Sequence, residues 1–259
     1  MEELVKKSAP PDSIEERAKK DLGSPFRVIL TTLVLFFASQ VVAALLVGVY
    51  IGVHIGAKIS ENLDQSAPIQ FFYVLLAEGL SVWLVLKIVK RRGLSLPAIG
   101  LGRKPRWLDV KKALFGAAGV YLALISVSIL IMLLFPSFDI NQTQDVGFTH
   151  LNSGLDNLLA FVSLVIIPPL GEEILVRGYL YSGLRSRMKF VPAMLVTSGL
   201  FGLAHLTTGA GGAMIWLAAV DTFILSLMLV YLREKTGALW AGMLVHSLNN
   251  LVAFFVTFH

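Results

Sequence analysis

The sequence predicts an all-α polytopic membrane protein, a bundle of about seven to eight transmembrane helices around a hydrophilic intramembrane cavity. Of the 259 residues, 56% are hydrophobic and only 15% are charged, whereas roughly a quarter of the residues in soluble domains are charged. The apolar residues are gathered in long blocks, and a few polar residues interrupt the later blocks. Polar residues at membrane depth usually line a cavity or a functional site.

Seven apolar blocks have close to the ~20 residues that a spanning helix needs. They cover about residues 27–54, 69–88, 113–136, 157–182, 190–206, 213–232 and 238–258. The polar residues 1–25 predict a cytoplasmic tail, and residues 26–259 an integral membrane domain. The sequence has no cysteine, which excludes disulfides, thiolate metal sites and a cysteine nucleophile.

Basic residues alternate between the loops and so predict the topology. The tail up to Arg27 carries six Lys and Arg, and the second, fourth and sixth loops are also basic. The first loop has only Lys58, and the third loop, the fifth loop and the C-terminus have none. The positive-inside rule therefore predicts a cytoplasmic N-terminus and an external C-terminus. We expect the plasma (inner) membrane of a prokaryote, or the ER membrane of a eukaryote, and no nucleic-acid partner.

Two adjacent glutamates, Glu172 and Glu173, lie in the fourth block. Pro168 and Pro169 precede them, and because proline has no backbone N–H, we expect a break or kink there. Glu173 and Arg177 are four residues apart and share a helix face, which predicts a buried ion pair. Glu172 points elsewhere and has no partner nearby in the sequence. It is the better candidate for chemistry.

Three polar residues in later blocks could meet Glu172: His205, His246 and Asn250. His246 and Asn250 are four residues apart and share a helix face. At ~1.5 Å per residue from the nearest cytoplasmic charge, the four residues lie about 16 to 24 Å into the membrane. They therefore occupy one layer, in its middle-to-outer part. A lone histidine near a helix end usually has a structural role, so His205 counts only as part of this set.

These residue types fit hydrolysis by an activated water. A carboxylate, alone or with a histidine, can take a proton from water, and a neutral histidine and an amide can stabilise an oxyanion. Glu172, His205 and His246 could instead hold zinc, although the HExxH pattern is absent. Asparagine is a poor zinc ligand, which favours the metal-free alternative. We expect Glu78 and Asp221, two further intramembrane acids, to form interhelical hydrogen bonds or line the cavity.

Three short motifs resemble those of the CPBP intramembrane proteases, a family that includes CAAX prenyl endopeptidases, bacteriocin-processing enzymes and abortive-infection proteins. EExxxR runs from Glu172 to Arg177, FxxxH from Phe201 to His205, and HxxxN from His246 to Asn250. The resemblance covers about residues 155–255, which it implies are the catalytic core.

The resemblance also implies a mechanism. Glu172 and His205 would activate water, His246 and Asn250 would stabilise the oxyanion, and Glu173 and Arg177 would support them. The implied substrate is a membrane-embedded or lipid-modified peptide, prenylated or CAAX-like. CAAX peptides end in the cytosol, however, whereas the estimated depth is nearer the outer face, so the bilayer is thinned there or the substrate differs. The alternative is a non-catalytic scaffold, immunity factor or small transporter that uses the cavity for binding.

Overall fold

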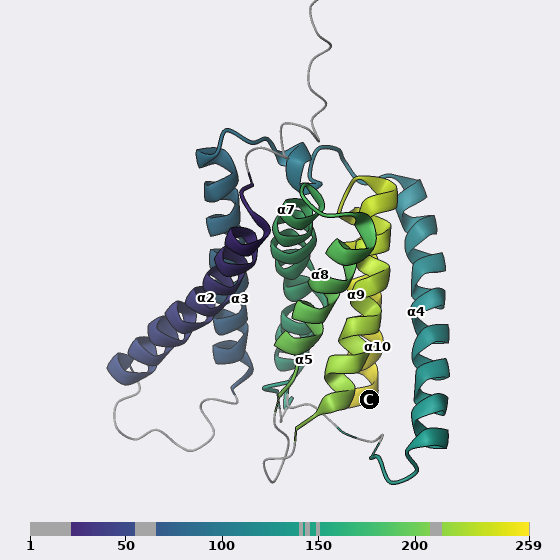
Figure 1. The fold of residues 1–259 in the computed structure, drawn as a ribbon. Helices are drawn as coiled ribbons and strands as arrows, with labels where there is room; N and C mark the ends of the chain where they lie inside the picture. Colours follow the sequence, from purple (N-terminus) through teal and green to yellow (C-terminus); the bar gives the residue numbers. More distant parts are fainter. Residues whose placement is uncertain are drawn as a thin grey trace, which may run out of the picture.

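The chain folds into a bundle of tilted helices (Figure 1). The computed structural model describes residues 22–54, 66–139, 142, 146–148, 151–207 and 214–258. Most of the predicted tail, residues 1–21, lies outside the described residues. The long helices include α2 (Pro25–His54), α3 (Ala67–Arg91), α4 (Trp107–Leu134), α9 (Trp216–Thr236) and α10 (Trp240–Phe258), and α8 (Phe190–Ala204) is shorter. A 3₁₀ turn, η1 (Leu96–Ile99), follows α3.

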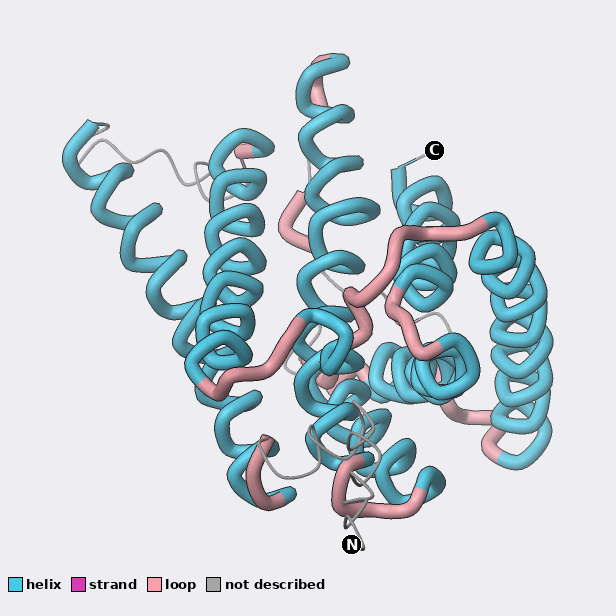
Figure 2. Tube along the Cα trace, turned by 90° about the horizontal axis from the view of Figure 1, so that it is seen from above, coloured by secondary structure: helices cyan, strands magenta, loops and turns pink. Residues whose placement is uncertain are grey.

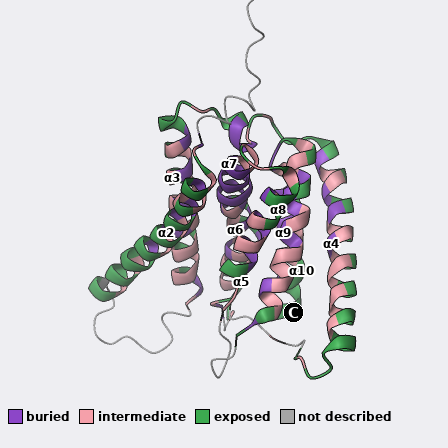
Figure 3. Ribbon diagram, viewed as in Figure 1, coloured by how far each residue is buried: buried purple, intermediate pink, exposed green. Residues whose placement is uncertain are grey.

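A further helical stretch, Gly154–Arg185, forms the centre of the bundle. It consists of α5 (Gly154–Phe161), the π-helical turn η2 (Val162–Ile166), α6 (Ile167–Glu172), the π-helical segment η3 (Glu173–Leu180) and α7 (Tyr181–Arg185). All eight residues of η3 are buried. This part of the chain is purple in Figure 3, where exposed residues predominate on the outer helices. Large exposed apolar side chains on α2 and α4 are what a lipid-facing surface requires.

The predicted break at Pro168–Pro169 is a local widening of a continuous helix. Pro168 has no N–H for the carbonyl of Leu164, four residues earlier, and the turn before it is π-helical. The Nδ2 amide of Asn250 on α10 donates instead to the Leu164 carbonyl, at 2.9 Å. A side chain from another helix thus replaces the backbone bond that proline removes. The helix passes through the prolines without a free end.

Six described helices are long and apolar enough to cross a membrane, and α8 is a shorter apolar helix. The all-helical membrane fold is therefore confirmed. The fifth predicted block, 190–206, forms a helix of only 15 residues, about 22 Å long against a hydrocarbon core of about 30 Å. Because α8 ends early, His205 at its C-terminal end lies short of the length of a full membrane span.

Close helix packing fixes α8 against α9. A Cβ at Gly202 of α8 would lie 2.7 Å from the backbone oxygen of Ala219 on α9. Glycine is therefore needed at this crossing, and it sets the position of the end of α8. Seen from above, α2 leans away from the rest of the bundle (Figure 2).

The basic residues at the ends of α3, α7 and α9 lead to the first prediction. Lys90, Arg185 and Arg233 lie in the last turns of these helices, consistent with one cytoplasmic face. Reporter fusions after Arg106 and after Asp145, which lies outside the described residues, should label opposite sides of the membrane. If both reporters label the same side, the predicted topology is wrong.

Candidate active site

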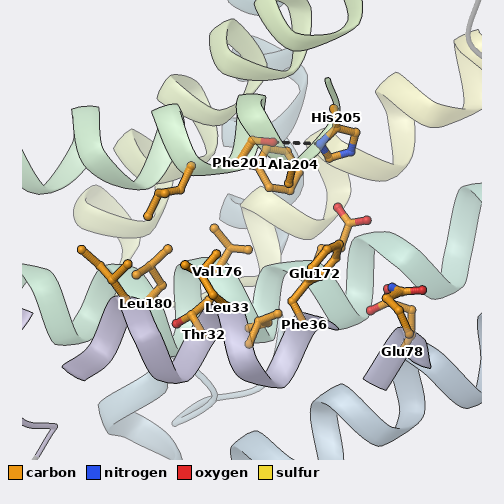
Figure 4. Close-up of a pocket in the computed structure, with 14 residues that line it drawn as sticks. Thr32, Leu33, Phe36, Glu78, Glu172, Val176, Leu180, Phe201, Ala204 and His205 are labelled. Atoms are coloured by element: carbon orange, nitrogen blue, oxygen red, sulfur yellow. Dashed lines mark hydrogen bonds between the residues drawn. The ribbon is translucent and has the colours of Figure 1, made fainter. Parts of the chain in front are cut away.

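The candidate site is built from three elements that carry the predicted residues to one place. Glu172 ends α6, His205 follows α8, and His246 lies on α10. The Nε2 atom of His246 is 3.7 Å from Oε2 of Glu172. Figure 4 shows the Glu172 carboxylate and the His205 ring facing each other. The side chain of Glu172 remains 20% exposed whereas that of Glu173 is 1% exposed, so only Glu172 can reach water in the cavity.

A cavity of about 180 Å³ adjoins Glu172, between α2, α3, α8 and the central helix. One end is polar and contains Glu78, Glu172 and His205. The rest is mainly apolar, and Thr32 and Gln40 are polar exceptions. The apolar lining is Ile29, Leu33, Phe36, Leu175, Val176, Leu180, Leu200, Phe201 and Ala204. The sequence predicts a hydrophilic cavity, but the lining of this cavity is mostly apolar. Its polar groups are gathered where the candidate residues lie.

The predicted ion pair between Glu173 and Arg177 is present. The Arg177 Nη1 donates to Oε1 of Glu173 at 2.8 Å, and both side chains are almost completely buried. The Arg177 Nη2 donates to Oγ of Ser226 on α9, at 2.5 Å. The guanidinium carbon also lies 4.3 Å from the centre of the Phe201 ring, within the range of a cation–π contact.

His246 lies between the two glutamates. Its Nδ1 is 3.4 Å from Oε1 of Glu173, and its Nε2 faces Glu172. A carboxylate beside one ring nitrogen selects the tautomer with its proton on that nitrogen. Glu173 thus favours an Nδ1–H. The Glu172 carboxylate beside Nε2 favours a proton on that nitrogen in the same way, so either ring nitrogen can act as the donor. The contact gives Glu173 a second role in addition to pairing with Arg177.

Phe201 packs against both histidines. Its ring centre is 4.6 Å from that of His205 and 5.9 Å from that of His246. The backbone oxygen of Phe201 lies 2.9 Å from Nδ1 of His205, so this nitrogen can donate and Nε2 is left for other contacts. The FxxxH spacing places one ring between Arg177 and the two histidines, a packing role that the motif alone does not indicate.

Asn250 shares a helix with His246, but its amide is already in use. Nδ2 donates to the Leu164 carbonyl, and Oδ1 lies 3.5 Å from Nδ2 of Asn249. A primary amide has two N–H donors, so a second N–H remains. The sequence could not reveal this bond, because Leu164 is 86 positions away.

The described residues do not form a metal site. No group of three His, Asp or Glu side chains is arranged to hold a metal ion among them. His205 directs Nδ1 at a backbone oxygen, and His246 directs Nδ1 at Glu173. The set considered for zinc, Glu172, His205 and His246, is therefore not among such groups, although both histidines keep Nε2 free of these contacts.

The structure separates the other two intramembrane acids. Glu78 on α3 lines the same cavity as Glu172. Cavity lining is one of the two roles expected for it. Asp221 on α9 is half-buried and is not part of the cavity lining. Ser226 gave no signal in the sequence, because a serine on an apolar helix is usually satisfied by its own backbone.

A helical membrane bundle that encloses a carboxylate and two imidazoles defines a candidate intramembrane hydrolase. Residues 154–252 match the family model of the type II CAAX prenyl endopeptidases, Rce1-like. The matched segment coincides with the part of the chain that resembles the CPBP intramembrane proteases, and the match supports a CAAX-type intramembrane endopeptidase as its general class. All six candidate residues lie within the matched segment. No curated protein and no solved structure matches the chain.

The Glu173–Arg177 pair leads to the second prediction. Glu173→Gln should lower the free energy of unfolding by about 3–5 kcal/mol, because it leaves a buried guanidinium without its counter-charge. Glu173→Gln combined with Arg177→Met should recover most of this loss, because no unpaired charge remains. Both can be measured by thermal unfolding in detergent. Equal losses in the single and double variants would contradict the interpretation.

Proposed function

We propose that this protein is an intramembrane endopeptidase that hydrolyses a peptide bond with a water activated by Glu172 and His205. The observation that carries the proposal is that Glu172 and His205 line one end of a cavity, while Nε2 of His246, on a third helix, lies 3.7 Å from the Glu172 carboxylate. Glu172 Oε2 is buried and has no hydrogen-bond donor among the described residues. The Glu172 side chain lines the cavity and is 20% exposed, so its carboxylate can accept a proton from a water there.

The remaining residues take supporting roles. Nε2 of His246 and the second N–H of Asn250 are donors for the oxyanion that forms when the water oxygen bonds to the carbonyl carbon. Glu173 fixes the His246 ring, and Arg177 holds Glu173. The proton taken by Glu172 then goes to the leaving amine nitrogen, so the carboxylate is restored.

The cavity also favours a substrate class. Its apolar part extends along η3 from Val176 to Leu180, towards the end of the central helix where Arg185 lies. A lipid or a large apolar side chain would bury its surface there, with the scissile bond at the polar end. This direction favours a substrate that enters from the basic, predicted cytoplasmic side. It supports a membrane-embedded or lipid-modified peptide, including a prenylated CAAX-like one.

Glu172→Gln is the third prediction. The variant should lose about 10²–10⁴-fold in kcat/KM, the usual contribution of a general base, and should unfold at nearly the wild-type temperature. The assay is cleavage of internally quenched peptides in liposomes, one a farnesylated CAAX peptide and one an unmodified transmembrane peptide.

Asp221→Asn is the matched control, because it neutralises an intramembrane acid that does not line the cavity, and it should retain activity. Normal turnover by Glu172→Gln would refute the assignment. If wild type cleaves neither peptide but binds them with the same affinity as Glu172→Gln, the protein is a binding protein. Faster cleavage of the farnesylated peptide would identify the lipid as part of the recognised substrate.

The fourth prediction concerns metal dependence. Wild-type protein should keep its cleavage rate within about twofold after exhaustive chelation, because the proposed base is a carboxylate that needs no metal to accept a proton. The measurement compares rates before and after chelation and after adding back one equivalent of zinc. Loss of activity followed by recovery with zinc would make the protein a metalloprotease.

A further inference from the structure

Glu78 is an acid at the polar end of the cavity to which the mechanism above gives no role. It projects from α3 and lines the cavity together with Glu172 and His205. Glu78 and Glu172 lie close enough to interact electrostatically. The sequence contained no sign of this pairing, because the two acids are far apart in the chain and on different helices.

Gly171 fixes the place of the Glu78 carboxyl. A Cβ at Gly171 would lie 2.0 Å from Oε2 of Glu78 and 3.0 Å from its Cβ, so only glycine leaves room for it. The Glu78 carboxyl therefore lies directly against the backbone of α6, one residue before Glu172. This contact fixes the position of Glu78 relative to Glu172.

The surroundings of Glu78 and Glu172 favour a state in which one of the two carboxyls is neutral. No Lys or Arg is among the described residues that line the cavity. Arg177 is engaged with Glu173. The titratable groups that face Glu78 are Tyr73 on its own helix, Glu172 on α6 and His205 at the end of α8. Two carboxylates in a poorly solvated site repel strongly and usually share one proton.

The hydroxyl of Tyr73 does not donate a hydrogen bond to Glu172. It donates to Oε1 of Gln40 on α2, at 2.5 Å. Glu172 has no donor for its buried Oε2 among the described residues. Of the neutral donors in the cavity wall, Thr32 already donates to the backbone of Val28. A protonated Glu78, which packs against Gly171 beside Glu172, can supply a hydrogen bond to the ionised base without adding charge.

We propose that Glu78 is a positioning residue of this site, which holds the one proton of a Glu78–Glu172 carboxyl pair and so keeps Glu172 ionised and directed at His205. The inference rests on the proposed function. In the reaction, the proton of water goes to Glu172 and the water oxygen bonds to the carbonyl carbon. Glu78 keeps its own proton throughout. It therefore affects the ionisation and orientation of Glu172 but exchanges no proton with the substrate.

The test compares kcat, KM and the pH dependence of kcat/KM for wild type, Glu78→Gln and Glu78→Leu, with the farnesylated CAAX peptide as the probe. Glutamine is neutral and keeps a donor, so Glu78→Gln should retain kcat within about threefold and an unchanged acid limb. Leucine has no donor, so its acid limb should move up by about one pH unit, with KM within about twofold. An acid limb that moves down in Glu78→Gln would show that Glu78 is ionised and would overturn the proposal.

Gly171→Ala tests the geometry without changing any charge. The added methyl would displace the Glu78 carboxyl, so this variant should show the same shift as Glu78→Leu, and the two changes together should shift no further. Gly79→Ala is the matched control, because a Cβ at this neighbouring glycine of α3 meets nothing within 4 Å. It should leave the profile unchanged. Additive shifts of Gly171→Ala and Glu78→Leu would contradict the shared cause.

An infrared measurement separates this inference from the proposed function. At neutral pH the wild type should show the C=O stretch of a protonated carboxyl, which Glu78→Gln removes and Asp221→Asn leaves. This readout needs no turnover. If Glu78→Gln removes no band, the inference fails whatever the activity. If Glu172→Gln turns over normally while the band behaves as expected, the proposed function fails and the protonated Glu78 stands.

Discussion

The buried ion pair between Glu173 and Arg177 is the interaction on which the rest of the site depends. It lies in η3, where every residue is buried, and it contacts three other helices through Ser226, Phe201 and His246. A charge pair at this depth is stable only if its remaining hydrogen-bonding groups are satisfied. The helices that satisfy it also carry the two histidines. The packing that neutralises the pair therefore assembles the site around Glu172.

Much of this architecture could be predicted from the sequence. The apolar blocks gave the helices, because a membrane helix must satisfy its own backbone and so needs a continuous apolar run. The four-residue spacing of Glu173 and Arg177 gave their contact, because it depends on one helix only. The similar estimated depths of Glu172, His205 and His246 were enough to suggest that they meet. The catalytic roles of these residues remain proposals.

Other features depend on packing between distant segments. The predicted block ran to residue 206, two residues past the end of α8 at Ala204, because a single polar residue followed by Leu206 does not mark a helix end. Glu78 was expected to form interhelical hydrogen bonds or line the cavity, and its contact with the backbone at Gly171 depends on how α3 packs on α6. The bond from Asn250 to Leu164 likewise joins two helices and follows no local spacing rule.

The short separation of Glu173 and Arg177 has a consequence for biogenesis. A charged residue at the centre of a helix adds about 2.5–3.5 kcal/mol to the free energy of membrane insertion. Because the two charges are four residues apart on one helix, they can pair while that helix enters the bilayer, before α8, α9 and α10 have been synthesised. The pair can thus be inserted without a net charge of its own. The contacts with Phe201, Ser226 and His246 form later. In a nascent chain the charge of Glu173 is therefore neutralised before the helices that complete the proposed site have been made.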